Sequence, residues 1–340
     1  MGSRKASIKG IYSYLPPTKL TNEQLALEFP DLDIDKAFES TGVAVRWIAA
    51  PDECASDLGV LAAQRLFSSG ICSPGEIDFL LFCTQSPHYF MPATACIMQN
   101  RLGLPTTCGA FDFNLGCSGF VYGLALAKSL IETDLATNVL LIAGDSSTRA
   151  INPRDRGVRL LFSDGASATL IAASTNHDEA IGPFVMGTDG RGAKNLIVPA
   201  GGMRLRPNPE AAIAKDDGTG NFRSAQELFM DGAEIFNFSL QTVPKAINQL
   251  LEKGRIKLEE VDLFVFHQAN KFMLEALRRK IKIPKEKFII NLEFYGNTSS
   301  ASIPMALEVA IAQGQVAKGA KVVVVGFGVG YSWAAALIKI

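Results

Sequence analysis

The chain repeats its own pattern of apolar strands, and this repetition constrains the fold more than any other feature. Residues 76–82 (EIDFLLF) match residues 260–266 (EVDLFVF) position by position in chemical character. The apolar run Val139–Gly144 matches Val322–Gly326 in the same way, and both offsets are about 183 residues. Similarity at a constant offset indicates an internal duplication.

Each repeated strand is apolar at nearly every position, which is typical of sheets covered on both faces. Segments with helical periodicity, such as Ala55–Ser68, separate the strands. The sequence therefore predicts an α/β protein of two halves, each with a mixed, buried sheet, at residues 1–173 and 174–340. The segment Arg191–Ser224 is rich in Gly, Pro and charge, and we expect it to be a surface insertion near a site entrance.

Cys117 lies where a predicted strand, Cys108–Phe113, gives way to a predicted helix over Val121–Leu130. The turn between them has glycine at 116 and 119, which would allow a close approach of substrate or backbone. A helix N-terminus favours an anion, so we expect a stabilised thiolate and a nucleophile. A small buried residue between helix and sheet explains the position equally well.

The duplication gives this turn a counterpart in the second half. Asn291–Ser300 is expected to contain a strand and a turn carrying Asn297, followed by a helix over Ala301–Ala312. His267 follows another apolar strand of that half. If the halves pack about a pseudo-two-fold axis, Cys117, His267 and Asn297 face one cleft. Taken separately, His267 would be an ordinary core histidine and Asn297 a helix cap.

Three motifs resemble the signatures of the β-ketoacyl-acyl-carrier-protein synthase III family. They are Leu115–Phe120 (LGCSGF), Phe266–Asn270 (FHQAN) and Gly296–Ser302 (GNTSSAS), and the resemblance extends from Ile8 to Ile340. It implies a thiolase-like fold, with a five-layered αβαβα core that is internally duplicated, and a homodimer. The three motifs occur in the family's order and spacing, which makes the match specific.

The resemblance also implies a reaction: decarboxylative Claisen condensation of an acyl starter with malonyl-acyl-carrier protein in fatty acid biosynthesis. Cys117 would carry the acyl group as a thioester. His267 and Asn297 would hold the enolate oxygen, and backbone N–H groups of Cys117 and Val329 the acyl oxyanion. Because Asn297 is a neutral donor, enolate stabilisation is favoured over proton abstraction by a carboxylate.

Substrate contacts follow from the same resemblance. Arg149, Gly232 and Asn270 would bind coenzyme A or pantetheine. Met91 would reach across a dimer into the partner's acyl tunnel, although a packing role explains this methionine as well.

The chain departs from the family at Lys36 and Ser40, where members primed by acyl-CoA carry a tryptophan and an arginine that clamp the adenine. This departure makes a starter delivered on a carrier protein, or a specialised starter, more credible.

A basic run over residues 271–287 includes Lys271, Arg278 and Arg279. It could be an ordinary solvated helix face, or a docking patch that steers an acidic acyl carrier protein toward the cleft behind His267.

Composition excludes several other classes. Lys and Arg number 33 against 34 Asp and Glu, which argues against nucleic acid or membrane surfaces as partners. No apolar run reaches the roughly 18–20 residues of a membrane span, and the N-terminus has no apolar signal core, so we expect a cytoplasmic protein.

The six cysteines show no CxxC spacing, and no histidine stands at metal-ligand spacing from them. We expect no metal and no cofactor besides the thioester substrates. The cysteines other than Cys117 are expected to be reduced core residues. Of the histidines outside the cleft, His88 is a weaker pocket candidate, and His177 is expected to be a solvated loop residue.

Two alternative functions use the same fold. One is a starter-specific condensing enzyme or an acyltransferase of a specialised, polyketide-like pathway. The other is a non-catalytic partner subunit of a heterodimeric synthase, against which the intact Cys117, His267 and Asn297 argue.

Overall fold

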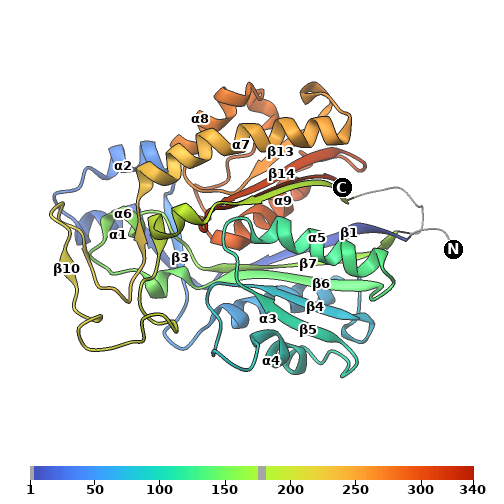
Figure 1. Ribbon diagram of the computed structural model, residues 1–340, viewed down its shortest axis with the longest axis horizontal. Coiled ribbons are helices and arrows are strands. Elements are labelled where there is room, and N and C mark those ends of the chain that lie inside the picture. The colour runs from blue at the N-terminus through green and yellow to red at the C-terminus, as the bar shows by residue number, and fades with distance from the viewer. Residues whose placement is uncertain (1–3, 175–180) are drawn as a thin grey trace.

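The computed structural model describes residues 4–174 and 181–340, and its helices and sheets stack in five layers (Figure 1). His177 and the first three residues lie outside the described ranges. The helices of the middle layer separate the two sheets, and two further helix layers cover the outer sheet faces (Figure 1). The layered helices are α5 (Gly119–Glu132) and α9 (Ser302–Ala312) in the middle, α3 (Ala55–Ser68) and α4 (Thr94–Arg101) outside the first sheet, and α7 (Gly232–Gly254) and α8 (Lys271–Ile281) outside the second. The predicted five-layered αβαβα fold is confirmed.

The first sheet has the strand order β1-β7-β6-β4-β5. β4 pairs in parallel with β5 and β6, whereas β7 runs antiparallel to β6 and β1. Its strands are β1 (Lys5–Tyr14), β4 (Phe79–Cys83), β5 (Gly109–Phe113), β6 (Asn138–Asp145) and β7 (Gly165–Ser174).

The second sheet has the order β13-β14-β15-β8 and reproduces the first without its fifth strand. β14 takes the place of β6: Leu263 pairs with Val322 in parallel as Phe79 pairs with Val139. Its strands are β8 (Ile181–Thr188), β13 (Leu263–Phe266), β14 (Lys321–Gly328) and β15 (Ser332–Lys339). The equivalent order and register confirm the duplication. The boundary at residues 173 and 174 falls at the end of β7 and stays a prediction.

The core lies mainly between the two sheets. Phe120 and Leu124 of α5 and Leu307 of α9 are fully buried against strand residues of both sheets, such as Leu141 and Val324. Complete burial of such side chains contributes about 1.5–3 kcal/mol each. The middle helices are therefore held by both halves, which fixes the ends of the two sheets relative to each other.

Two expectations about local structure are wrong. In place of a strand within Asn291–Ser300, the chain has a turn, and the fifth position of the second sheet holds only an isolated bridge between Phe264 and Phe288. Cys96 is exposed rather than part of the core, and Cys54 and Cys108 are half-buried. All six cysteines are free.

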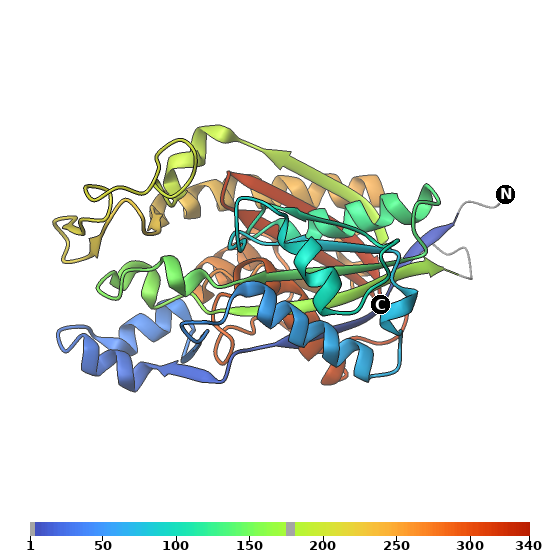
Figure 2. The same ribbon diagram turned by 90° about the horizontal axis from the view of Figure 1, so that it is seen from below.

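The connections at one end of the sheets are long and form a cap opposite both termini (Figures 1 and 2). This end includes the predicted insertion, most of whose residues are exposed. The elements of the cap are β2 (Thr18–Thr21), α1 (Asn22–Glu28), α2 (Ile34–Thr41), β3 (Val45–Ile48), α6 (Arg156–Arg159), β9 (Leu196–Ile197), β10 (Lys215–Asp216), β11 (Phe222–Arg223) and β12 (Phe229–Met230). Within residues 4–174 and 181–340, no helix has the length and apolar character needed to cross a bilayer.

Candidate active site

Cys117 lies in the turn between β5 and α5, two residues before the helix begins. The N–H of Gly119 donates to the Gly116 carbonyl at 2.7 Å and closes this turn. The buried hydroxyl of Ser118 lies 2.6 Å from that of Ser332 on β15, so the turn is tied to the second half of the molecule. The nucleophile candidate therefore sits at the junction of the two halves.

Strand β14 approaches this turn more closely than any side chain would allow. A Cβ on Gly326 would lie 2.5 Å from the Cys117 carbonyl oxygen, and one on Gly328 would lie 2.7 Å from Sγ. Both positions need glycine for lack of space. Gly116 and Gly119 make room in turn for the side chains of Gln85 and Cys83.

The sulfur is buried, with only 7% of the residue exposed, and this burial raises the pKa of Cys117 to about 11. Hydrogen bonds from the backbone N–H groups of Val329 and of Cys117 itself lower the pKa, and the charge of Asp145 raises it, but burial has the largest effect. The expectation of a stabilised thiolate is wrong for the free protein. The two N–H groups directed at the sulfur are those expected to hold the acyl oxyanion.

His267 follows β13, and its ring is fixed by the second half alone. Its Nδ1 lies 2.8 Å from the hydroxyl of Ser302, which begins α9 and also accepts from the Gln268 N–H at 3.3 Å. Since that hydroxyl accepts from Gln268, its own hydrogen is available to Nδ1, and we assign the ring hydrogen to Nε2. Burial lowers the pKa of His267 to about 3, so the ring is a neutral donor at pH 7.

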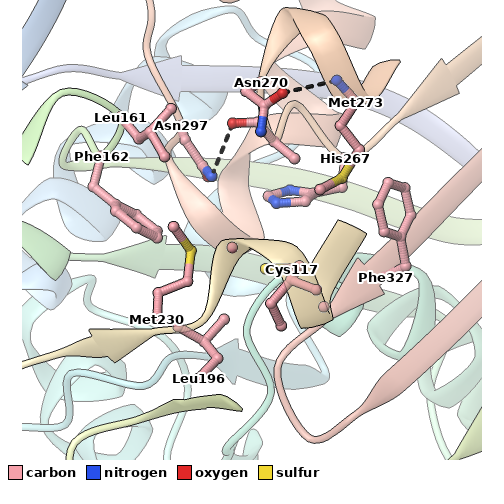
Figure 3. Close-up of a pocket in the computed structure, with 14 residues that line it drawn as sticks. Cys117, Leu161, Phe162, Leu196, Met230, His267, Asn270, Met273, Asn297 and Phe327 are labelled. Carbon is pink, nitrogen blue, oxygen red and sulfur yellow. Dashed lines mark hydrogen bonds between the residues drawn. The ribbon is translucent and has the colours of Figure 1, made fainter. Parts of the chain in front are cut away.

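The amide of Asn297 is oriented by its own turn. Its Oδ1 accepts from the Ser299 N–H at 3.0 Å, which leaves the NH2 group as the part that can face the cavity. That group makes one long hydrogen bond, 3.4 Å, to the Ala269 carbonyl (Figure 3). The backbone of Asn297 also bridges to Phe162, a residue of the first half. Asn297 is therefore fixed as a hydrogen-bond donor.

Cys117, His267 and Asn297 line one small cavity of about 50 Å³ (Figure 3). Two other predicted residues, Gly232 and Asn270, also line it. Neutral donors from the second half thus face a thiol from the first half inside a largely apolar space, as the pseudo-symmetry predicted.

A second cavity, of about 240 Å³, meets the first at Cys117. Phe162 and Leu196 belong to the walls of both. The second cavity combines apolar and polar side chains from segments far apart in sequence: Gln85, Ser86, Asn114, Ser147, Ala150, Ile197, Val198, Leu228, Ser299 and Val329. This cavity is not predictable from the sequence, because no local motif marks its lining.

The other predicted substrate residues lie outside the small cavity. Arg149 is exposed, and its guanidinium donates to the carbonyls of Ala50 and Pro51 at 3.0 and 2.5 Å. Met91 is 82% exposed and lines a surface depression instead of the cavity of this protomer. Lys36 and Ser40 are exposed on α2, which packs beside α8.

The predicted basic patch lies on α8, but one of its members is not available for docking. Arg278 donates to Glu275 at 2.8 Å and to the Ile283 carbonyl at 3.0 Å, and 18% of its side chain is exposed. It therefore stabilises the helix C-terminus. Lys271 and Arg279 are exposed.

One group outside the cavity has metal-ligand chemistry. The ligand atoms of Cys54, Asp57 and His88 lie within 4.8 Å of one another. However, Asp57 is paired with Arg101 at 2.7 Å and accepts from the Cys54 N–H at 2.6 Å, and His88 contacts Ser56 at 2.6 Å. These contacts engage the Asp57 carboxylate and the His88 ring and place the Arg101 cation beside them, so the group is poorly suited to a metal ion.

The comparisons with known proteins agree with the motifs. Residues 111–190 match the family model described as 3-oxoacyl-[acyl-carrier-protein] synthase III, and residues 251–340 match the model of its C-terminal part. A protein from Caldanaerobacter subterraneus named beta-ketoacyl-[acyl-carrier-protein] synthase III is 37% identical over 98% of this chain and 97% of its own length. A protein of the same name from Clostridium perfringens is 38% identical over 99% of this chain and its whole length.

A solved structure described as 3-oxoacyl-(acyl-carrier-protein) synthase III superposes with a TM-score of 0.97. It is 48% identical and covers 99% of this chain and all of that one.

Proposed function

This chain belongs to the 3-oxoacyl-[acyl-carrier-protein] synthase III family, and from that premise we propose how its residues carry out the reaction. The protein is an acyltransferase of fatty acid biosynthesis that condenses an acyl starter with malonyl-acyl-carrier protein. The observation that carries the proposal is the shared cavity: a thiol, a neutral histidine and an oriented amide face one space.

In the first half-reaction, Cys117 Sγ forms a bond to the carbonyl carbon of the starter thioester. The thiol proton passes to the leaving thiolate of coenzyme A or carrier protein. Negative charge on the carbonyl oxygen is stabilised by the N–H groups of Cys117 and Val329, which already point at the sulfur. The acyl chain then occupies the larger cavity beyond Cys117.

In the second half-reaction, the bond between the malonyl α-carbon and its carboxylate breaks and CO2 leaves. The electron pair moves onto the thioester as an enolate, whose oxygen accepts hydrogen bonds from His267 and Asn297. The enolate carbon attacks the acyl carbon, the C–S bond to Cys117 breaks, and the thiolate that leaves takes a proton from solvent to restore the thiol. The thioesters supply all of the chemistry, so no metal or other cofactor takes part in the proposed reaction.

A neutral His267 suits this role. An imidazolium would be costly to bury here, since burial lowers the pKa of this ring to about 3. A neutral N–H can stabilise the developing enolate without protonating it.

The proposal is tested by intact-mass measurements on the wild type and two variants. Cys117→Ala should form no acyl adduct with any acyl-CoA or acyl-carrier thioester. Asn297→Ala should acylate as the wild type does but condense about 10²–10³-fold more slowly with malonyl-acyl-carrier protein, the usual cost of one lost oxyanion donor. A wild type without an adduct, or discharge of the adduct without CO2, would contradict the assignment.

The acyl carrier protein is the macromolecular partner. We propose that it docks on two exposed cations of α8: Lys271, which follows Asn270 at the start of the helix, and Arg279, in its last turn. Arg149, Gly232 and Asn270 are proposed to contact the coenzyme A or pantetheine arm. A cytoplasmic location belongs to the same proposal and is checked by cell fractionation.

We further propose that the protein is a homodimer. An exposed apolar surface supports this proposal, because such surfaces are typical of protein–protein interfaces. It is formed by Tyr89, Phe90 and Met91, which are 62%, 78% and 82% exposed. Sedimentation velocity that finds only the 36.5 kDa monomer would contradict this.

A further inference from the structure

Asp145 is a buried carboxylate that the reaction described above does not use. It ends β6, it is fully buried, and it lies close enough to Cys117 for its charge to raise the pKa of the thiol. Burying a carboxylate is costly unless hydrogen bonds compensate. Burial indeed raises the pKa of Asp145 to about 6, partly offset by hydrogen bonds from Ser300 and Gln85.

Those hydrogen bonds join the two halves of the molecule. Oδ1 accepts from the Gln85 N–H at 2.7 Å, in the loop that follows β4 of the first half. Oδ2 accepts from the Ser300 hydroxyl at 2.6 Å and from its N–H at 3.4 Å. Ser300 lies in a 3₁₀ turn, Ser299–Ala301, of the second half. One carboxylate therefore holds both loops.

The turn held by Asp145 is the one that orients Asn297. Its first residue, Ser299, donates the N–H that holds the Asn297 Oδ1 at 3.0 Å and so directs the NH2 group toward the cavity. The residue after the turn, Ser302, contacts His267 Nδ1 at 2.8 Å. A displacement of this turn would move the enolate donors relative to Cys117.

The pseudo-symmetry shows that the carboxylate is specific to one half. The residue that ends β14, in the place equivalent to Asp145 on β6, is Gly328, where a Cβ would collide with the Cys117 sulfur. Only the first half has room for a side chain at this strand end.

We propose that Asp145 is a positioning residue that fixes the Ser299–Ala301 turn across the interface between the halves and so places the Asn297 donor beside Cys117. It acts on the decarboxylation and condensation step and not on acyl transfer to Cys117. The assignment of the two steps rests on the proposed function.

Asp145→Asn tests this with little change in volume. An amide oxygen can accept from one loop, but its NH2 group cannot accept the N–H from the other. Condensation should slow about 10–100-fold, the scale expected for a misplaced catalytic group. Acylation should stay within about threefold or become faster, because a negative charge near the thiol is lost. A variant whose fold is merely less stable should not slow condensation while it leaves the acylation rate unchanged or raises it.

Two further variants separate the contact between Asp145 and the turn from a general effect of a buried carboxylate. Ser300→Ala removes the hydroxyl that donates to Asp145. Condensation by the double variant, Asp145→Asn with Ser300→Ala, should be no slower than by Asp145→Asn alone, since both substitutions break the same contact. Asp164→Asn is the matched control: Asp164 is equally buried and accepts from the Ala49 N–H and the Thr148 hydroxyl, but not from the turn. It should change both half-reactions by a similar factor.

Amide hydrogen exchange over residues 297–302 gives a readout that needs no activity. Exchange there should rise in Asp145→Asn and Ser300→Ala, and stay as in the wild type in Asp164→Asn. Any of three results would overturn the positioning role. They are unchanged exchange in Asp145→Asn, an equal fall in the rates of acylation and condensation, and additive falls in the condensation rate of the double variant. A wild type that forms no acyl adduct would instead contradict the proposed function, and the exchange data would still decide the role of Asp145 in holding the turn.

Discussion

Cys117 has to be reactive and sheltered at once, and at the scale of single residues these demands oppose each other. Burial protects the thioester from water but disfavours the thiolate, which raises the pKa of Cys117 to about 11. The N–H groups of Val329 and Cys117 lower the pKa of the thiol, and in the proposed reaction they also stabilise the negative charge that forms on the acyl oxygen. The resting enzyme therefore keeps a protonated thiol, and ionisation belongs to the acylation step.

This leads to a prediction about alkylation. With a pKa of about 11, roughly one Cys117 thiol in a thousand is ionised at pH 8. The rate of alkylation by iodoacetamide should therefore rise about tenfold per pH unit from pH 8 to 10. Peptide mass spectrometry follows Cys117, with the exposed Cys96 as an internal reference in the same samples. A rate that is already constant below pH 8 would mean that the thiolate is present in the free enzyme.

The same shift has a consequence for stability. The folded protein holds the Cys117 proton more tightly than the unfolded chain does, because the pKa rises from the ordinary 9.0 to about 11. The contribution of this group is therefore complete below pH 9 and is lost as the pH rises through 11. Unfolding has to be monitored at each pH of the alkylation series for this reason.

At the scale of elements, the close packing of β14 on the Cys117 turn determines the geometry of the site. Backbone meets backbone there, so neither side can yield by rotating a side chain. The contact joins the strand that leads to Val329 with the turn that carries the nucleophile.

Gly326→Ala should test this packing. The added methyl group would lie 2.5 Å from the Cys117 carbonyl oxygen and 2.6 Å from the Ser118 Cα. We expect a loss of about 1–3 kcal/mol in the free energy of unfolding and slower acylation. Thermal unfolding and intact-mass acylation measure the two effects. Gly75→Ala, at an exposed position with no atom within 4 Å, is the control, and equal behaviour of the two variants would refute the packing argument.

Most of the helices and strands could be predicted from the sequence, and the physical reasons differ between elements. β4 is apolar throughout and β6 is apolar between Asn138 and Asp145, because both faces of the sheet are covered, and α3 has its apolar residues at helical spacing. The prediction of a strand within Asn291–Ser300 was wrong because the second sheet ends at an isolated bridge between Phe264 and Phe288. A duplicated sequence pattern does not require that every strand be duplicated.

The site was predictable where functional residues follow buried strands at the same edge of the two sheets, as Cys117 does after β5 and His267 after β13. Other features depend on distant contacts that no local pattern reveals. The burial of Cys117 arises from β14, and the pairing of Arg278 with Glu275 removed it from the docking surface. Asp145 had one local signal, a carboxylate directly after buried strand residues at the sheet edge that carries the nucleophile.

At the scale of the whole molecule, positive and negative side chains are nearly equal in number. Electrostatic recognition of a carrier protein therefore has to come from the local distribution of charged side chains on the surface. Among the exposed cations of α8, Lys271 directly follows Asn270, which lines the small cavity, and Arg279 lies in the last turn of the helix.

Charge reversal tests the docking proposal. Lys271→Glu with Arg279→Glu should raise KM for malonyl-acyl-carrier protein several-fold at low salt, and less at high salt, because exposed charges are screened. Acylation by a free thioester should be unaffected. Lys9→Glu with Lys318→Glu, two exposed lysines away from the site, is the matched control. Equal loss with free and carrier-bound substrates would argue against docking at α8.

The meeting of the two cavities at one sulfur has a further consequence for the order of events. In the proposed reaction, the starter chain stays on its side of Cys117 while the coenzyme A or carrier arm that delivered it withdraws through the other side, past Asn270 and Gly232. The same passage then admits the malonyl arm. The first product has to leave before the second substrate enters, so the enzyme should show ping-pong kinetics, with parallel lines in double-reciprocal plots.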